Sequence, residues 1–388
     1  MNEHAPHSLL PRSRRSGRHR AVAVVTAVAA GVMTVGALAP TAAFAGGKPD
    51  NVQSSLNALV KDDGLPAALA SVKGRDGRTR TYTAGVGDVA TGAKPPVDGQ
   101  VRIGSNTKTF TAVVVLQLVA EGKVDLDAPA ETYLPGLLRG DGIDGRHITV
   151  RQLLQHTSGL PDYVDKDSIL TNPGRYYEPR ELLDAALSQK AHFAPGARWE
   201  YSNTNYLLAG LIIQKVTGRP LGEEVNRRIV DRIGLRHTYF PAPGDTGIRE
   251  AHPKGYNRDA DGSLRDYTEL DPSWGWAAGA AVSTPSDVTR FYTALLGGRL
   301  LPAAQLAEMR TTVPADEVVA GARYGLGLMS RPLSCGGVYW GHGGTIPGYY
   351  TAGGATDDGR ATSIAATMIP SDATEKHVAA AVDAALCR

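Results

Sequence analysis

The segment Ser105-Asn106-Thr107-Lys108-Thr109-Phe110 opens an apolar stretch of the 388-residue chain that has helical spacing. The spacing of the apolar residues predicts a largely buried helix from Asn106 to Gly122. Ser105 and Lys108 are three residues apart in its first turn, so their side chains share one face. The apolar positions that carry this prediction are Phe110, Val113, Val114, Leu116, Leu118 and Val119.

Ser105 and Lys108 could act together as a nucleophile and its base. A serine hydroxyl is a weak nucleophile until a base removes its proton. Lys108 can be that base when burial lowers its pKa enough for the amine to be partly neutral. The partial positive charge of the helix N-terminus favours the developing alkoxide. Ser-x-x-Lys is a short motif, however, and an ordinary helix start is the alternative.

Two further segments carry polar groups suited to the same site. Tyr201-Ser202-Asn203 follows the turn Pro195-Gly196 and opens an apolar helix, so the phenol and the amide can project from one loop. His342-Gly343-Gly344-Thr345 ends an apolar strand, where glycines allow a ligand to approach the backbone closely.

The order Ser-x-x-Lys, Tyr-x-Asn, His-x-Gly resembles the active-site signature of the class C β-lactamases and their relatives, in particular the secreted serine D-alanyl-D-alanine carboxypeptidases. The likeness covers nearly all of the chain after its first 45 residues. Further segments resemble that family: Leu153 to Leu160, Ser273-Trp274, Ala278-Gly279-Ala280, Ser283-Thr284, Tyr324 to Leu328, and Ser334-Cys335-Gly336.

The resemblance implies three catalytic residues. Ser105 would be the acylated nucleophile, Lys108 its proton partner, and Tyr201 the acid or base that serves the leaving amine. The backbone amides of Ser105 and Thr345 would form the oxyanion hole. The alternative for Tyr201 is a core aromatic whose hydroxyl is hydrogen-bonded.

The resemblance also implies a set of substrate-binding residues. Asn203 would hold the substrate amide, Trp274 would wall the pocket, and His342 would bring polarity near Tyr201 and the substrate carboxylate, with Gly344 and Thr345 beside it. The alternatives are a core tryptophan and a strand histidine. His156 is interpreted as structural.

Two departures from the carboxypeptidase pattern concern the substrate. Gly343 stands where those enzymes carry Thr, and Met329 stands where they tend to carry an Arg that binds the terminal carboxylate. Arg331 is two residues further on and lies on the same face if this segment is a strand, so it is a candidate substitute. Without such a bidentate partner a carboxylate binds much more weakly.

Along the chain, strands are expected near both ends and helices between them. Residues 67–73 and 81–89 form an expected hairpin, residues 338–341, 349–355 and 361–368 are expected strands, and the middle to about Arg236 is rich in helical signals. This predicts an α/β fold. Together with the resemblance it implies a β-lactamase/transpeptidase-like antiparallel sheet, from about 46–104 and 270–388, flanked by helices, with an inserted mainly helical lobe at about 105–269.

The first 45 residues are expected to be a secretory signal peptide, because five arginines precede an apolar run from Ala21 to about Ala39 and Ala43-Phe44-Ala45 supplies small residues around a cleavage point. A membrane anchor is the alternative. Residues 46–388 would then be one secreted hydrolase domain with no stable membrane anchor. Cys335 and Cys387 are expected to form a disulfide in an oxidising compartment, the alternative being two free thiols.

Other classes of function receive no support. Without the leader, 36 basic and 38 acidic residues remain, a net charge of about −2 that offers nucleic acid no attraction. Asn257, Asp259, Asp261 and Gly262 resemble a calcium loop, but Thr268 replaces its bidentate Glu, so a turn at Asp261-Gly262 is expected. No metal site or cofactor is predicted.

The expected activity is therefore that of a serine D-Ala-D-Ala carboxypeptidase, acting on peptidoglycan stem peptides through an acyl-enzyme and acylated by β-lactams. A β-lactamase, an esterase or a D-aminopeptidase on the same scaffold is the alternative that Met329 and Gly343 suggest. A non-catalytic β-lactam-binding protein is the alternative of another class.

Overall fold

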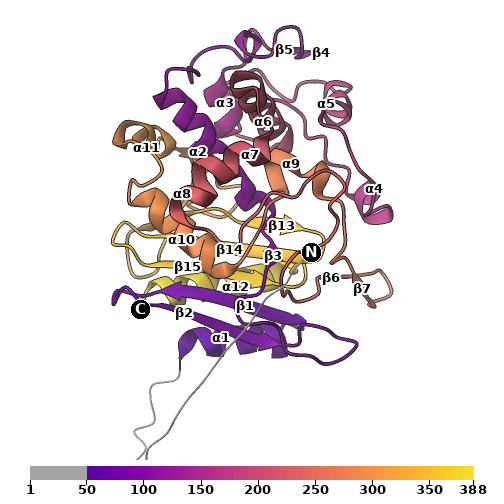
Figure 1. Cartoon of the computed structure of the whole chain (residues 1–388), viewed down its shortest axis with the longest axis vertical. Helices are drawn as coiled ribbons and strands as arrows, with labels where there is room; N and C mark the ends of the chain where they lie inside the picture. The colour runs from indigo at the N-terminus through magenta and orange to yellow at the C-terminus, as the bar shows by residue number, and fades with distance from the viewer. Residues whose placement is uncertain (1–49) are drawn as a thin grey trace, which may run out of the picture. The chain divides into compact units, whose positions relative to one another are not determined.

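The structure, a computed structural model, describes residues 50–388, and the expected signal peptide at 1–45 lies outside this part. The described part contains a nine-stranded sheet in the order β2-β1-β15-β14-β12-β11-β10-β9, with β13 also paired to β14 (Figure 1). Its strands are β1 (Ala67–Lys73), β2 (Thr79–Gly85), β9 (Val313–Pro314), β10 (Arg323–Tyr324), β11 (Met329–Pro332), β12 (Val338–Gly341), β13 (Gly344–Ile346), β14 (Tyr349–Ala355) and β15 (Ala361–Ala366).

Both ends of the described chain contribute to this sheet. The strand β1 pairs antiparallel with β15, with Ala70 opposite Ile364. All the pairings within the sheet are antiparallel. The predicted α/β class with an antiparallel sheet and flanking helices is confirmed. The second strand of the first hairpin ends at Gly85 rather than at residue 89, because Gly85 turns the chain with a φ of +82°.

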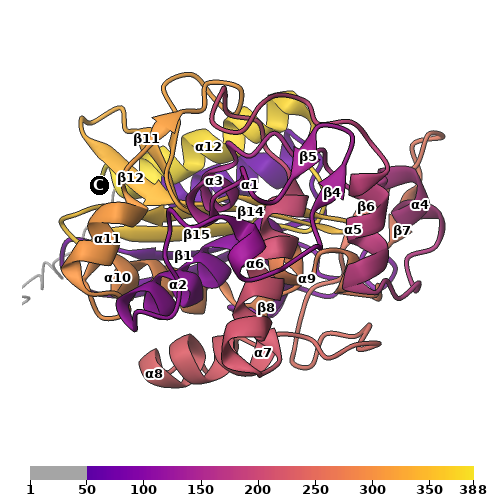
Figure 2. The ribbon, with the colours of Figure 1, turned by 90° about the horizontal axis from the view of Figure 1, so that it is seen from above.

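Helices cover both faces of the sheet (Figures 1 and 2). On one face, α1 (Asn51–Lys61) and α12 (Asp372–Leu386) pack their apolar sides onto Ala70 and Ile364 in one cluster. On the other face lies α10 (Pro285–Leu296), within the larger cluster that continues into the helical part of the molecule. Alternate residues of the central strands thus face two separate cores.

The remaining helices lie between β2 and β9 in the chain. They are α2 (Thr107–Ala120), α3 (Val150–Gln155), α4 (Lys166–Thr171), α5 (Pro179–Leu187), α6 (Asn203–Thr217), α7 (Leu221–Val225), α8 (Asp231–Ile233), α9 (Trp276–Gly279) and α11 (Ala303–Met309), with short 3-10 turns at Gly104–Asn106, Ala130–Thr132 and Pro272–Trp274 and a π turn at Asn226–Val230. Three two-stranded ribbons complete this part: β3 (Val101–Arg102) with β8 (Val282–Ser283), β4 (Arg139–Gly140) with β5 (Ile143–Asp144), and β6 (Tyr256–Arg258) with β7 (Leu264–Asp266).

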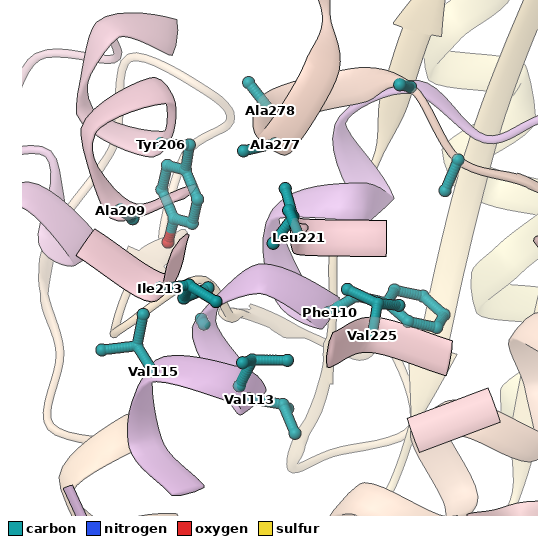
Figure 3. Close-up of a cluster of buried hydrophobic side chains, with 14 of the residues drawn as sticks. Phe110, Val113, Val115, Tyr206, Ala209, Ile213, Leu221, Val225, Ala277 and Ala278 are labelled. Carbon is teal, nitrogen blue, oxygen red and sulfur yellow. The ribbon is translucent and has the colours of Figure 1, made fainter. Parts of the chain in front are cut away.

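The helix α2 forms the centre of the larger core. Every residue from Thr107 to Leu118 is buried, which is typical of a helix that is apolar all round. Its Val113 and Val115 lie among side chains of α6, α7 and α9 (Figure 3). Phe110 stacks on Phe291 of α10 with 3.8 Å between ring centroids. Because α2 is buried along this length, its first turn, which includes Lys108, is held in a fixed position within the core.

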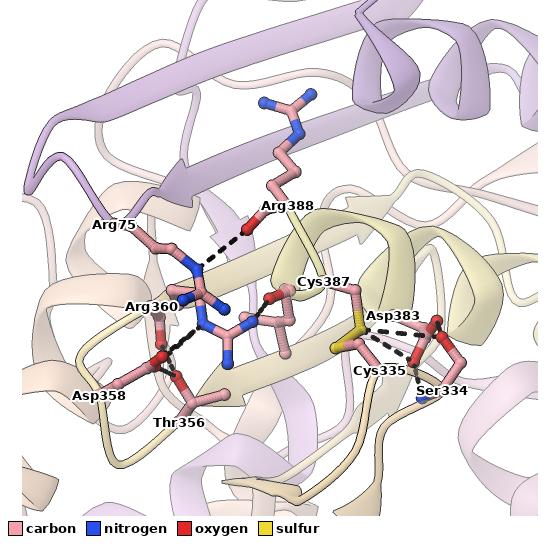
Figure 4. Close-up of a disulfide and its surroundings, with 10 residues drawn as sticks. Arg75, Ser334, Cys335, Thr356, Asp358, Arg360, Asp383, Cys387 and Arg388 are labelled. Atoms are coloured by element: carbon pink, nitrogen blue, oxygen red, sulfur yellow. Dashed lines mark hydrogen bonds and ion pairs between the residues drawn. A yellow bond between two sulfur atoms is a disulfide. The ribbon is translucent and has the colours of Figure 1, made fainter.

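The calcium-like segment and the cysteine pair both lie in the described part of the chain. The calcium-like segment is the hairpin β6–β7, and Asp261 caps its turn by accepting hydrogen bonds from Ser263. Cys335 and Cys387 form a disulfide that links the β11–β12 connection to the end of α12 (Figure 4). Within residues 50–388, none of the helices has the length and apolar character needed to cross a membrane.

Candidate active site

Ser105 lies in the 3-10 turn Gly104–Asn106, so α2 begins two residues after it at Thr107. This turn touches β13 backbone to backbone. A Cβ on Gly104, whose φ is +49°, would lie 2.9 Å from the Thr345 amide nitrogen, and one on Gly344 would lie 2.0 Å from the Ile103 carbonyl oxygen. Only glycines allow this approach. It brings the Thr345 amide against the turn that carries Ser105, where it is a candidate oxyanion-hole donor.

Asn106 holds the Ser105 turn in place through its side-chain hydrogen bonds. Its side-chain amide donates to Thr351 Oγ1 of β14 at 2.8 Å, and its carbonyl oxygen accepts from the Tyr292 hydroxyl of α10 at 2.7 Å. The Thr351 hydroxyl also donates to the Ile103 carbonyl oxygen. The turn is therefore held by the sheet and by α10 at once.

Lys108 is fully buried beneath Ser105 and makes three contacts. Its Nζ lies 3.0 Å from Ser105 Oγ, 2.7 Å from Asn203 Oδ1 and 2.8 Å from the Ala278 carbonyl oxygen. Burial lowers its pKa to about 7, and the charge of Asp162 opposes that shift. A substantial fraction of the amine is therefore neutral near neutral pH and can accept the serine proton.

Tyr201 approaches Ser105 from the other side. Its hydroxyl lies 2.8 Å from Ser105 Oγ, and its ring lies 4.8 Å from Lys108 Nζ. Burial raises the pKa of this phenol above its usual value. Tyr201 is thus protonated in the resting site and can donate to a nitrogen that leaves the reacting carbon.

His156 holds the loop that carries Tyr201. Its carbonyl oxygen accepts from the Glu200 amide, and its Nδ1 accepts from the Ser202 amide and the Asn205 side-chain amide. Its ring packs against Tyr201 with 4.4 Å between centroids. Burial keeps the pKa of His156 well below its usual value, so the ring is neutral. This arrangement agrees with the structural interpretation of His156.

Asn203 links Lys108 to Asp162. It heads α6, its Oδ1 accepts from Lys108, and its Nδ2 donates to Asp162 Oδ2 at 2.8 Å. Sequence reasoning missed Asp162, since it belongs to no motif and its role depends on a contact with a residue 41 positions away. The only local signal is its place two residues after Leu160, where the apolar helix and its turn have ended.

These groups open into a cavity of about 540 Å³. Ser105 and Tyr201 lie on its wall, and all the residues predicted to bind substrate line it: Asn203, Trp274, Arg331, His342, Gly344 and Thr345. Asp162 from the loop before α4, Ile169 of α4, Met329 of β11, Tyr350 of β14 and Glu375 of α12 also line the wall. The cavity is large enough for an amino-acid derivative or a short peptide.

His342 lies at the cavity but is turned into the protein. Its Nδ1 is 2.6 Å from the Gly343 carbonyl oxygen, which can only accept, so Nδ1 carries the proton and Nε2 accepts from the Tyr324 hydroxyl at 3.0 Å. Burial and Lys108 lower its pKa to about 3. His342 is therefore neutral with both ring nitrogens occupied, which makes it a support for Tyr324 rather than a ligand for a substrate carboxylate.

Met329 and Gly343, the two residues that depart from the carboxypeptidase pattern, both lie at the cavity. Met329 is 5% exposed and packs in one cluster with Trp199, Tyr324 and Tyr201, while Arg331 lines the cavity from the same face of β11. A Cβ on Gly343 would meet only the Thr351 carbonyl oxygen, at 3.4 Å. The missing threonine side chain thus leaves space at the cavity wall.

A serine hydroxyl between a buried amine and a neutral phenol, with a backbone amide against its turn, is an arrangement suited to acyl transfer to serine. In residues 50–388 no group of three or more His, Cys, Asp or Glu side chains is placed to hold a metal. The fold and the site together define a serine hydrolase of the β-lactamase and transpeptidase type. The family model Beta-lactamase matches residues 52–385, so the chain belongs to the β-lactamase family.

Among solved structures, the chain is similar to a D-stereospecific amidohydrolase from a Streptomyces species, with 40% identity, a TM-score of 0.78, and coverage of 85% of this chain and 97% of the other. It is also similar to a D-amino acid amidase from Ochrobactrum anthropi SV3 in complex with L-phenylalanine amide, with 29% identity, a TM-score of 0.75, and coverage of 86% and 97%.

Among curated proteins, a putative penicillin-binding protein PbpX of Bacillus subtilis is 29% identical over 248 residues, which are 64% of this chain and 56% of that protein. Protein flp of Staphylococcus aureus is 31% identical over 156 residues, which are 40% of this chain and 31% of that protein. The chain thus spans from about a third to somewhat more than half the length of these curated relatives.

Proposed function

We propose that this protein hydrolyses amides of D-amino acids, and peptides that begin with a D-residue, through an acyl-enzyme on Ser105. The observation that carries this proposal is Asp162. Its carboxylate lines the cavity next to Asn203, where it is suited to bind the α-ammonium group of an aminoacyl substrate. Similarity to a D-stereospecific amidohydrolase over nearly that protein's full length supports the same substrate class.

In the proposed reaction, Ser105 Oγ attacks the substrate carbonyl carbon while Lys108 accepts the serine proton. The carbonyl oxygen becomes an oxyanion next to the amides of Ser105 and Thr345. Tyr201 donates its proton to the nitrogen and the C–N bond breaks. The amine departs, and the acyl group remains bound to Ser105 as an ester. Water then attacks the ester and gives one proton to the Tyr201 phenolate, while the Lys108 ammonium returns its proton to Ser105 Oγ as the acid product leaves. No cofactor takes part in this sequence.

The experiment compares D-phenylalanine amide with L-phenylalanine amide on the purified protein, with Ser105→Ala in parallel. We expect turnover of the D-amide that Ser105→Ala abolishes, and a preference of at least tenfold for the D-form. Asp162→Asn tests the ammonium contact: its KM for the D-amide should rise, while an acyl donor that lacks an amino group should be affected much less. Equal turnover of the two enantiomers would overturn the proposal.

A second candidate is the D-Ala-D-Ala carboxypeptidase, acting on peptidoglycan stem peptides and acylated by β-lactams. Arg331 favours it, because this guanidinium lines the cavity on the same face as Met329 and offers a terminal carboxylate a partner. Release of D-Ala from diacetyl-Lys-D-Ala-D-Ala, together with Ser105-dependent labelling by a fluorescent penicillin, would favour this candidate over the D-amidase. A β-lactamase would turn the penicillin over instead of retaining it.

We also propose that the protein is exported and that its leader is removed near Ala45. The arginines and the apolar run that follows them support this, as does the disulfide, which needs an oxidising compartment to persist. N-terminal sequencing of protein recovered from the culture medium should give a start near Gly46. Recovery of the intact chain from the cytosol alone would contradict export.

A further inference from the structure

The sheet side of the cavity carries two opposite charges that the proposed reaction does not use. Arg331 comes from β11, and Glu375 comes from the first turn of α12; both line the cavity with Tyr350 of β14. Asp162, Asn203 and Trp274 belong to the helical side of the same cavity. If the helical side holds the aminoacyl part of the substrate, the group beyond the scissile bond extends toward β11 and α12.

Tyr350 connects these charges to the catalytic centre. It stands opposite Thr345 in the β13–β14 ladder, and its hydroxyl donates to Glu375 Oε1 at 2.9 Å. Burial raises the pKa of the Tyr350 phenol, Glu375 raises it further and Arg331 lowers it, so both charges act on the same hydroxyl. Tyr350 is 7% exposed, so its hydroxyl has a defined position from which it donates to the carboxylate of the exposed Glu375.

Arg331 and Glu375 do not neutralise each other. Neither side chain takes part in an ion pair within the part of the chain that the structure describes. A guanidinium and a carboxylate on one wall, both available to a ligand, match a group that carries an anion and a cation together. A simple terminal carboxylate would gain from Arg331 but would be repelled by Glu375.

We propose that this end of the cavity is a leaving-group subsite for a basic amino acid, whose free carboxylate contacts Arg331 and whose side-chain ammonium contacts Glu375. The inference rests on the proposed acyl-enzyme reaction and adds its preferred leaving group. Hydrolysis would then release a zwitterionic diamino acid, such as lysine, from the D-aminoacyl residue. The acylation step itself is unchanged, since the leaving nitrogen receives its proton from Tyr201.

The test uses the purified protein and three substrates that differ only in the leaving residue: D-Phe-Lys, D-Phe-norleucine and D-Phe-Lys-amide, each prepared with the second residue in both chiral forms. Norleucine removes the ammonium group, and the amide removes the carboxylate. Release of D-Phe gives kcat/KM for each, divided by the value for D-phenylalanine amide in the same variant. We expect D-Phe-Lys to exceed both analogues by about tenfold, the size of one charge-assisted contact.

Two variants and one matched control assign the effect. Glu375→Gln should bring the lysine-to-norleucine ratio to about one, and Arg331→Gln should do the same for the lysine-to-lysine-amide ratio. Lys166→Gln removes a charge from the α4 side of the cavity and should leave both ratios as they are. No preference for lysine in the unaltered protein, or an equal change of the ratios in all three variants, would overturn the subsite.

A second series separates this proposal from the proposed function. Diacetyl-Lys-D-Ala-X carries the same three leaving residues behind an acyl part without a free α-ammonium group. If D-Phe substrates are not hydrolysed but this series shows the lysine preference, the D-aminoacyl proposal fails and the subsite stands. If the D-Phe substrates are hydrolysed without a preference for lysine, the D-aminoacyl proposal stands and the subsite fails. No turnover of either series would overturn both proposals.

Discussion

Lys108 should determine the pH dependence of acylation. Its pKa of about 7 results from burial, and the neutral amine is the form that accepts the serine proton. We therefore expect kcat/KM for a nitrophenyl ester without an amino group to rise with pH through about 7, because the cationic lysine below that pH has no free electron pair. Lys108→Arg stays cationic and should lose activity at every pH. A profile that falls between pH 6 and 8 would contradict this assignment.

Tyr201 should matter more for amides than for activated esters. Tyr201→Phe keeps the ring against His156 but removes the hydroxyl 2.8 Å from Ser105 Oγ. An amide nitrogen needs a proton to leave, so its kcat should fall by about 10²–10⁴-fold. A nitrophenyl ester, whose leaving group departs as an anion, should lose much less.

The control for that change is Tyr256→Phe, which removes a hydroxyl bonded to the Val89 amide. It should leave the amide-to-ester ratio unaltered. An equal loss on both substrates in Tyr201→Phe would indicate a general disturbance of the site and would refute a role in protonating the leaving group.

At the scale of elements, the contact between the Ser105 turn and β13 should set the catalytic rate. Gly104→Ala would place a Cβ 2.9 Å from the Thr345 amide nitrogen, at a φ of +49° that L-residues seldom adopt. Either β13 or the turn must move, which misplaces an oxyanion donor. Loss of one such donor costs about 10²–10³-fold in kcat.

Gly174→Ala is the matched control, since a Cβ there meets nothing within 4 Å. Activity of both variants is compared well below their unfolding temperatures, which are measured separately by circular dichroism. If folded Gly104→Ala retained the original kcat, the close approach of the two backbones would have no part in catalysis.

At the scale of the whole molecule, the disulfide should contribute mainly to stability. It joins residues 52 positions apart and ties the β11–β12 connection to the end of α12. Cross-linking a loop of this length restricts the unfolded chain, so the Cys335→Ala/Cys387→Ala variant should lose about 2–4 kcal/mol of unfolding free energy.

Urea denaturation followed by tryptophan fluorescence measures that loss. Reducing agent should lower the midpoint of the original protein and leave that of the double variant where it is. Identical midpoints for the two proteins under oxidising conditions would contradict a stabilising role of the bond.

The sequence by itself determined the features that local spacing controls. Ser105 and Lys108 share a face because three residues make most of one helical turn, and α2 is buried because its apolar residues leave no polar face. Tyr201 and Asn203 stay together because they flank one residue at the start of α6. The alternation of strands and helices likewise predicted the α/β class, since each element's period is local.

Only the tertiary structure decided how separate elements meet. The contact of Asp162 with Asn203, the contact of Glu375 with Tyr350, and the orientation of His342 toward Tyr324 depend on how the sheet and the helices pack. Periodicity sets directions within one element, while distances between elements follow from the volumes that the whole core must fill. That is why the sequence was enough to predict that Ser105 and Lys108 lie together, whereas the charges that we propose select the substrate emerged only from the packed fold.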